Sequence, residues 1–149
     1  MGKIEVEVEV KSSADKFWEA ITDSAVLFPK IFPEQYKSIE ILEGDGKSVG
    51  SIRLLTYGEA IPIVTFAKEK IEVADEANKS LAYSVIDGEL ATLFKIFKAS
   101  LQVVPKGDGS SVKWSLEFEK ASEEVPDPDL TLELAVKTFN DLDAYLLKA

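Results

Sequence analysis

The chain has 149 residues with 17 basic and 27 acidic side chains, a net charge of −10, and this length fits a single domain over residues 1–149 with a substantial buried core. It contains no cysteine and no histidine, which excludes disulfides, thiol nucleophiles, Ser-His-Asp triads and the commonest zinc ligands. So acidic a chain lacks the concentrated positive surface that a nucleic acid or an anionic membrane requires, and we expect neither as a partner.

The start of the chain and its hydropathy predict where the protein works. The first residues alternate with glutamates instead of forming a signal-peptide pattern, and no apolar run approaches the length of a membrane span. We therefore expect a cytoplasmic protein without integral membrane association. A monomer is expected as well, although no pattern in the sequence determines the oligomeric state. The residue types give neither a cofactor motif nor a metal site, so we predict that the protein holds no cofactor and no metal.

The first part of the chain predicts one strand followed by two short helices. Apolar and acidic residues alternate strictly over residues 3–10, as in a strand with one buried face and one acidic, wetted face. Ser12 and Ser13 then open a helix, in which Ser12 and Asp15 have the spacing of a weak capping box. A second helical segment, 24–32, contains Pro29 and is expected to be brief or kinked.

From Tyr36 onward the apolar pattern changes to a period of two, which is typical of strands. The predicted strands are 36–43, 50–58, 63–74, 78–86, 91–104 and 111–120. Their connections are short and rich in turn-forming residues such as Gly, Asp, Asn and Ser. Such short connections predict that consecutive strands pair antiparallel.

The last stretch, 128–148, predicts a long helix, for which Asp127 can act as the cap and Pro128 suits the first turn. One stripe of it is apolar and consists of Leu132, Ala135, Val136, Phe139, Leu142 and Leu146. Asp143 interrupts this stripe. We interpret it as an end-of-helix carboxylate, paired or solvated, and the alternative is a polar group offered to a cavity. The element order predicts an α+β domain whose curved seven-stranded antiparallel sheet wraps around this helix.

Several motifs give the chain a family resemblance over its whole length. They are LFPKIFP at 27–33, EGDGKSVGSIR at 43–53, YSVIDG at 83–88, KWS at 113–115 and YLL at 145–147. In their order and spacing the sequence resembles the major latex protein branch of the plant pathogenesis-related class 10 (Bet v I-like) superfamily. The resemblance implies a START-type helix-grip fold, with two short helices after the first strand and a large ligand cavity between sheet and C-terminal helix.

The resemblance also implies a function. Members of the superfamily bind apolar or amphipathic small molecules such as steroids, flavonoids, hormones and fatty acids, and they are linked to plant defence and stress responses. An intracellular carrier or sequestering protein is therefore expected. The alternative is an enzyme of specialised metabolism that condenses, cyclises or isomerises a substrate in the same cavity, with Lys, Tyr or carboxylate groups of shifted pKa in place of histidine. A third hypothesis, ranked last, is an interaction module that docks a partner on its acidic strand face.

The glycine-rich loop 43–50 raises the question of phosphate binding. Glycine loops that cradle phosphates usually lead into a helix, whereas this one lies between two predicted strands and carries Glu43 and Asp45. We interpret it as a tight turn.

Arg53 is the most informative charged residue. In the predicted strand 50–58 it shares a face with Leu55 and Tyr57, so all three face the cavity if any of them does. A buried guanidinium requires a partner, for which Glu69 and the Tyr83 hydroxyl are candidates. In the family, a basic residue at the matching place lies at the cavity. We predict that Arg53 is the polar anchor of an apolar pocket; the alternative is an exposed strand charge.

Aromatic side chains on the predicted strands are candidates for the cavity wall. Such residues usually form plain core, but a curved sheet around a single helix leaves space that side chains need not fill. The predicted ligand-binding residues are Arg53, Leu55, Tyr57, Phe66, Glu69, Tyr83, Phe97, Trp114, Ala135 and Phe139. No catalytic residue is assigned.

Overall fold

The computed structural model describes residues 1–61 and 64–149. Within this part of the chain the strands are β1 (Gly2–Val10), β2 (Tyr36–Glu43), β3 (Ile52–Tyr57), β4 (Phe66–Asp75), β5 (Ser80–Gly88), β6 (Phe94–Lys106) and β7 (Gly109–Lys120). The helices are α1 (Ala14–Thr22), α2 (Ser24–Ile31), α3 (Glu89–Leu93) and α4 (Asp129–Lys148). The strands form one antiparallel sheet in the order β1-β7-β6-β5-β4-β3-β2.

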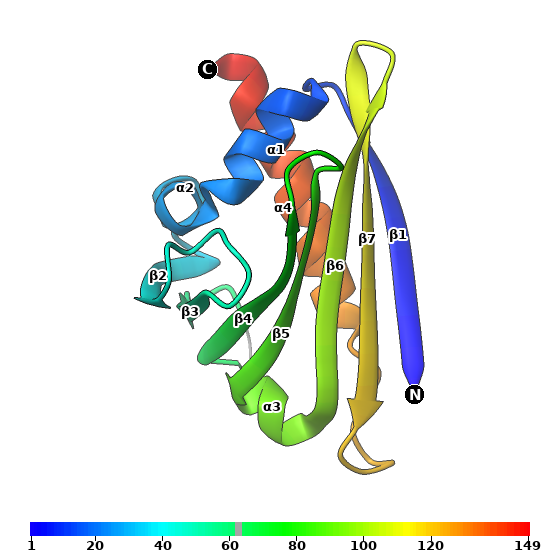
Figure 1. Ribbon diagram of the computed structural model, residues 1–149. Coiled ribbons are helices and arrows are strands. Elements are labelled where there is room, and N and C mark those ends of the chain that lie inside the picture. Colours follow the sequence, from blue (N-terminus) through cyan, green and yellow to red (C-terminus); the bar gives the residue numbers. More distant parts are fainter. Residues whose placement is uncertain (62–63) are drawn as a thin grey trace.

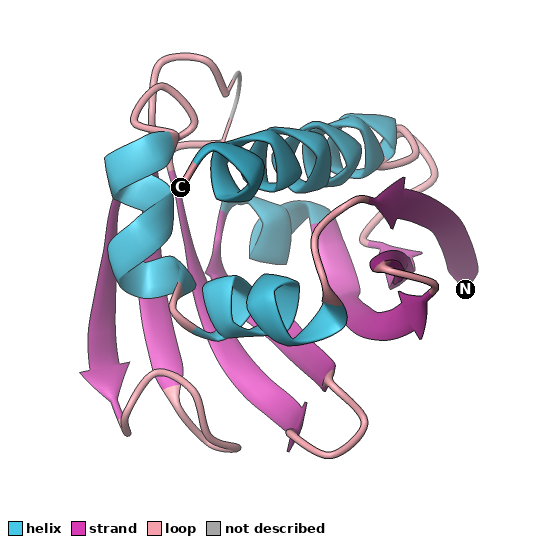
Figure 2. Cartoon of the chain, turned by 90° about the horizontal axis from the view of Figure 1, so that it is seen from above, coloured by secondary structure: helices cyan, strands magenta, loops and turns pink. Residues whose placement is uncertain are grey.

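The sheet is curved and α4 crosses its concave side, with α1 and α2 at one end of the sheet and α3 at the other (Figure 1). Seen from above, all the long helices lie on the same side of the sheet (Figure 2). The closest backbone approaches of α4 are to β1 and α1. This arrangement confirms the predicted α+β fold with a seven-stranded sheet around a C-terminal helix.

The alternation of side chains explains which face of the sheet is buried. In β1 the side chains of Val8 and Val10 are buried and the intervening glutamates are exposed, as predicted. In β7 the inward side chains Val112, Trp114 and Leu116 are each at most 3% exposed. These residues meet α1 and the second half of α4 in a densely packed core.

The two ends of the predicted strand 91–104 differ from the structure. Residues 89–93 form the short helix α3, and β6 begins only at Phe94 and continues to Lys106. Gly88 precedes this helix with φ +107, and a Cβ there would clash with the carbonyl oxygen of Phe66, so only glycine fits the turn. The neighbouring strand was predicted to begin at Ile63, which lies outside the described residues; β4 is described from Phe66.

The junction between β1 and α1 is tied to the C-terminal helix by Asp143. This carboxylate accepts hydrogen bonds from the backbone amides of Lys11 and Ser12, both at 2.9 Å, and from the Ser12 hydroxyl at 2.6 Å. The interpretation of Asp143 as a paired carboxylate is therefore confirmed. The predicted capping box is wrong, because Ser12 bonds to Asp143 and the neighbouring Ser13 caps α1 by accepting from the amide of Lys16.

The start of α4 also differs from its prediction. Pro128 occupies the N-cap position, and no side chain caps the helix. Asp127, the predicted cap, instead pairs with Lys120 at the end of β7, at 2.6 Å. The predicted apolar stripe is confirmed, since Phe139 and Leu142 are buried and the other four members are partly buried against the core.

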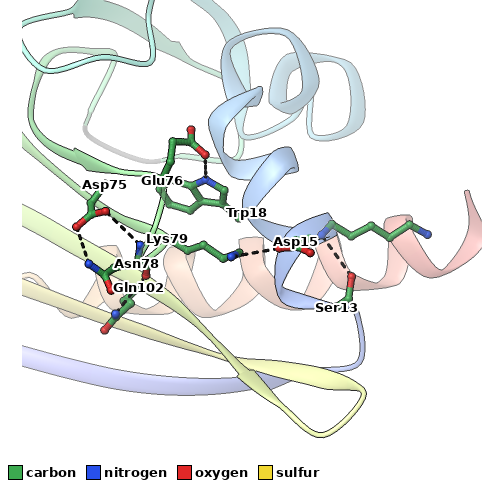
Figure 3. A network of polar contacts seen from close by, with 9 residues as sticks. Ser13, Asp15, Trp18, Asp75, Glu76, Asn78, Lys79 and Gln102 are labelled. Carbon is green, nitrogen blue, oxygen red and sulfur yellow. Dashed lines mark hydrogen bonds and ion pairs between the residues drawn. The ribbon is translucent and has the colours of Figure 1, made fainter.

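A network of polar contacts holds α1 against the turn between β4 and β5 (Figure 3). Trp18 Nε1 donates to Glu76 Oε2 at 2.8 Å, and Lys79 Nζ lies 3.1 Å from Asp15 Oδ1. Lys79 has a left-handed backbone with φ 51, which is uncommon for a residue with a side chain. The network joins α1 to the rim of the sheet, and α1 in turn covers one end of the space described next.

Candidate ligand cavity

A cavity of about 430 Å³ lies between the first half of α4 and the concave face of the sheet. Its wall comes from strands β2 to β6, from α2 and the first half of α4 with the segment before it, and from Ile21 of α1, Leu90 and Leu93 of α3 and Trp114 of β7. The wall is predominantly apolar, and the volume falls in the range of roughly 300–1,000 Å³ that is usual for small-molecule sites. The space exists because α4 approaches β1 and α1 closely but stands away from the middle strands.

All but one of the predicted site residues line this cavity. Those that line it are Arg53, Leu55, Tyr57, Glu69, Tyr83, Phe97, Trp114, Ala135 and Phe139. Phe66 is not among the lining residues, because Ala67, Glu69 and Ile71 point inward from β4 and are buried, and residues at even positions point away. Phe66 and Glu69 therefore cannot share a face of this strand, and the prediction for Phe66 is wrong.

Arg53 is the only arginine in the sequence, and it is buried at the polar end of the cavity, 6% exposed. It stands directly opposite Glu69 in the β3–β4 register. Its Nη2 donates to Glu69 Oε1 at 2.7 Å, and its Nη1 donates to the Ser24 hydroxyl at 2.8 Å. Glu69 is thus the partner that the sequence predicted, while Ser24 takes the place expected for Tyr83.

The charges of this pair depend on each other. Burial raises the pKa of the Glu69 carboxyl, and the adjacent guanidinium opposes this rise. A guanidinium suits such a position because it stays protonated and presents several donors in a fixed plane. Its Nε nevertheless has no hydrogen-bond partner among the described residues, so the pair keeps unused hydrogen-bonding capacity.

Three tyrosines add neutral hydroxyl groups to the cavity wall. Burial raises the pKa of Tyr36 to about 12, partly offset by the hydrogen bond with Thr138. Burial also raises the pKa values of Tyr57 and Tyr83 well above their usual value, helped by the nearby charge of Glu69. At neutral pH these hydroxyls are therefore uncharged, so they serve as hydrogen-bond donors and acceptors and not as phenolate bases.

Sequence reasoning missed several polar lining residues, among them Ser24, Tyr36 and Thr138. Ser24 is the first residue of α2, a position where serine is common because its hydroxyl can cap the helix. Nothing in the local sequence therefore indicates that Ser24 bonds to Arg53. Thr138 is 6% exposed and lies four residues after the lining residue Leu134, which is helical spacing. That spacing is the one signal by which it could have been found.

The cavity opens beside the first turns of α4, where the lining residues become exposed. Leu130, 59% exposed, contributes an apolar side chain to this mouth. Asp127 and Lys137 also line it and form ion pairs with Lys120 and Asp141, each at 2.6 Å. Glu133 lines the same opening without an ion-pair partner among the described residues, so the mouth carries a net negative charge.

The glycine loop between β2 and β3 is closed by its own anion. The Asp45 carboxylate accepts hydrogen bonds from the amides of Lys47 and Ser48, at 2.8 and 2.7 Å, and these bonds lower its pKa. The run Gly46-Lys47-Ser48 has the ending of a phosphate-binding loop. Because Asp45 already occupies these amides and no helix follows, the loop is a tight turn, as predicted.

Residues 1–61 and 64–149 contain neither a candidate metal site nor a candidate membrane-spanning helix. No cluster of carboxylates in this part of the chain has the arrangement of a metal site. None of its helices combines the length and the apolar character needed to cross a membrane.

Fold and cavity together define a helix-grip protein, in which a curved antiparallel sheet and a C-terminal helix enclose a mostly apolar internal space. Residues 1–149 match the model of the pathogenesis-related protein Bet v 1 family. MLP-like protein 423 of Arabidopsis thaliana is 52% identical over 147 residues, which cover 99% of this chain and 95% of that one. The chain therefore belongs to the Bet v 1 family, in its major latex protein branch.

Solved structures agree with this placement. The ginseng major latex-like protein 151 from Panax ginseng matches with a TM-score of 0.89 and 32% identity, over 98% of this chain and 97% of that one. Norcoclaurine synthase from Thalictrum flavum, solved in complex with dopamine and hydroxybenzaldehyde, matches with a TM-score of 0.79 and 27% identity. That likeness covers 99% of this chain and 87% of the synthase.

Proposed function

We propose that the protein carries or sequesters small apolar or amphipathic molecules in the cavity between α4 and the sheet. The observation that carries this proposal is an internal space of about 430 Å³ whose wall is mostly apolar. Protein interiors are normally packed as densely as organic crystals, and an empty space forfeits dispersion contacts around its whole lining. A bound molecule restores those contacts.

The predicted site residues divide into two groups under this proposal. Leu55, Phe97, Trp114, Ala135 and Phe139 contact the apolar body of the ligand. Arg53, Glu69, Tyr57 and Tyr83 contact its polar end, with Arg53 as the anchor. Each of these residues lines the cavity, and a few convergent polar groups in an apolar wall are what orient a small ligand.

The family supports a wider proposal about the protein's setting. The major latex protein branch is linked to defence and stress responses in plants, so we place the carrier in the cytoplasm as a monomer with a role in such a response. The native ligand is then a plant metabolite.

A second candidate is an enzyme working in the same cavity, and the likeness to norcoclaurine synthase favours it. Its general base would be Glu69, with the three lining tyrosines as hydrogen-bond donors, since Lys137 lies at the exposed mouth. Native mass spectrometry of the protein from its own tissue separates the two candidates. An unmodified retained metabolite supports the carrier, and a converted one supports the enzyme.

The direct test of the cavity is titration of the native protein with a neutral naphthylamine dye whose fluorescence rises in apolar surroundings. We expect saturable binding with one dye per chain, while the near-ultraviolet circular dichroism of the protein stays that of the folded state. Binding that appears only at acid pH or in mild denaturant, where packing is lost, would contradict the proposal, because partly unfolded states also bind such dyes.

A further inference from the structure

We propose that the cavity selects neutral, hydroxyl-bearing amphipathic ligands over carboxylates of the same carbon skeleton, because the charge at its polar end is already balanced within a closed ion pair. This inference rests on the proposed ligand-binding function and deepens it by naming the chemical class of the ligand. Its evidence is the hydrogen bonding of Arg53 and Glu69 and the charges of the groups around them.

The ion pair leaves both a donor and an acceptor unused. Arg53 is bonded to Glu69 and to Ser24, and its Nε has no partner among the described residues. Glu69 accepts at Oε1, and no described group donates to its Oε2. The Arg53 Nε is fully buried, so the atom that a ligand can reach is Oε2 of Glu69, to which a hydroxyl group can donate and a carboxylate cannot.

The charge balance works against an anionic ligand. Glu69 lies 2.7 Å from the guanidinium, so any ligand group close to Arg53 also meets the field of a carboxylate. Attraction to one partner and repulsion from the other largely offset each other. A buried carboxylate also loses its hydration, and this loss is compensated only when a partner charge is free. A hydroxyl loses far less on burial.

Among the described lining residues, no other cation lies at this depth. The hydroxyls of Tyr36, Tyr57 and Tyr83 are neutral, and the other basic residue among those lining the cavity, Lys137, lies at the mouth in a pair with Asp141. Glu133 makes the mouth net negative, and the chain as a whole carries a charge of −10. An anion is therefore disfavoured at the entrance as well as at the polar end.

The experiment compares three naphthalene derivatives that carry their substituent at the same ring position: naphthaleneethanol, naphthaleneacetate and ethylnaphthalene. Each displaces the neutral naphthylamine dye from the full-length protein at neutral pH. We expect the alcohol to bind at least about tenfold more tightly than the acetate, the ratio that corresponds to one well-made interaction of this kind. The hydrocarbon reports the apolar contribution alone, and we expect it to bind no more tightly than the alcohol.

Two variants separate the ion pair from the overall charge. Glu69→Gln keeps the shape of the side chain but frees the charge of Arg53, so the ratio of the acetate affinity to the alcohol affinity should rise about tenfold or more. Glu72→Gln changes the net charge by the same amount at an exposed position of β4. It should leave the ratio of the two affinities unchanged.

Each outcome decides between the inference and the function on which it rests. If none of the three compounds displaces the dye and the dye itself does not bind, the proposed function fails. If the hydrocarbon and the acetate bind and the alcohol is no better than the acetate, the function stands and the inference is overturned. The comparison in the unaltered protein is decisive even if Glu69→Gln does not fold. Equal gains in acetate affinity from Glu69→Gln and Glu72→Gln would also overturn the inference, because the gain would then come from the net charge and not from the ion pair.

Discussion

Arg53 of β3 and Glu69 of β4 stand opposite each other in the sheet and form a cross-strand ion pair. Both residues are buried, with 6% and 4% of their surface exposed. A buried pair of this kind contributes little net stability, because the desolvation of both charges offsets most of their attraction. Removal of one partner is different, because it strands the other charge in an apolar interior. The pair is therefore better understood as a polar feature of the cavity than as a source of stability.

This view predicts a non-additive result. Arg53→Leu should lower the free energy of unfolding by about 3–5 kcal/mol, because Glu69 is left buried without its cation. The double variant Arg53→Leu/Glu69→Leu should be clearly more stable than Arg53→Leu alone, since it removes both charges. Urea denaturation of the single and double variants measures the difference. A double variant as unstable as the single one would show that the pair is required for packing.

Asp143 is the second residue whose charge matters to the fold. Partial burial by itself would raise its pKa, but hydrogen bonds from the Ser12 hydroxyl and from the amides of Lys11 and Ser12 outweigh burial and hold the pKa below its usual value. A carboxyl with a lowered pKa stabilises the folded state above its unfolded pKa of about 3.9 and loses that contribution as the pH falls through its folded pKa.

The pH dependence of unfolding tests this contribution. Asp143→Asn should be less stable than the parent at neutral pH, and the difference should shrink as the pH falls below about 4, where the parent's carboxyl becomes protonated. Asp108→Asn, in the exposed turn between β6 and β7, is the matched control and should lower stability little at any pH. A gap between Asp143→Asn and the parent that stays constant with pH would contradict the assigned role.

At the scale of elements, the cavity-lining residues of α4 differ in how much they contribute to the packed core. Phe139 is 4% exposed and packs edge-on against Phe17 of α1, with ring centroids 6.1 Å apart. Leu134 also lines the cavity but is only partly buried. Phe139 therefore anchors the helix in the core as well as bordering the cavity, whereas Leu134 is less deeply packed.

Truncation of each residue should separate these contributions. Phe139→Ala should cost about 3–5 kcal/mol of unfolding free energy, as for a large aromatic residue in a packed core. Leu134→Ala should cost less than that, because the cavity already borders its side chain, and should change the affinity for the naphthylamine dye more than it changes stability. Denaturation midpoints and dye affinities of the two variants give the comparison. Identical stability losses would mean that the helix is rotated from the orientation described.

The sequence predicts most of these elements, because their signals are local. Period-two alternation places Arg53, Leu55 and Tyr57 on one face of β3, and helical spacing gives the buried stripe of α4. Phe66 was predicted from its aromatic character alone, but it is three positions from Glu69 and therefore on the opposite face of β4. Ser24 could not be predicted, because its bond to Arg53 joins residues 29 positions apart whose meeting is a result of tertiary folding.

The short helix α3 shows a different limit. Its residues have no apolar periodicity of their own, and a helix of five residues is too short to be stable alone. Tertiary contacts form it between β5 and β6, after the turn that Gly88 permits. Local preference therefore gave no warning of it.

The whole molecule is packed unevenly. Around β1, β7 and α1 the side chains interdigitate, with Phe17, Val112 and Leu116 fully buried. Around β3 to β5 the concave face borders about 430 Å³ of space. The dense side is therefore expected to hold the fold together by itself, and the hollow side is where the proposed ligand would add stability.

Thermal unfolding with and without a bound compound tests this division. Because a ligand that binds only the folded state adds stability by mass action, a compound at 100 times its dissociation constant should add about 2.7 kcal/mol and raise the Tm by roughly 5–11 °C for a chain of this size. Ala135→Phe places an aromatic ring in the cavity from the lining face of α4, so its Tm should no longer respond to naphthaleneethanol or to the naphthylamine dye. Ala144→Phe, on the exposed side of the same helix, should keep the full response of the parent. An Ala135→Phe protein that retains that response would show that the compounds bind elsewhere, and the cavity would then not be the ligand site.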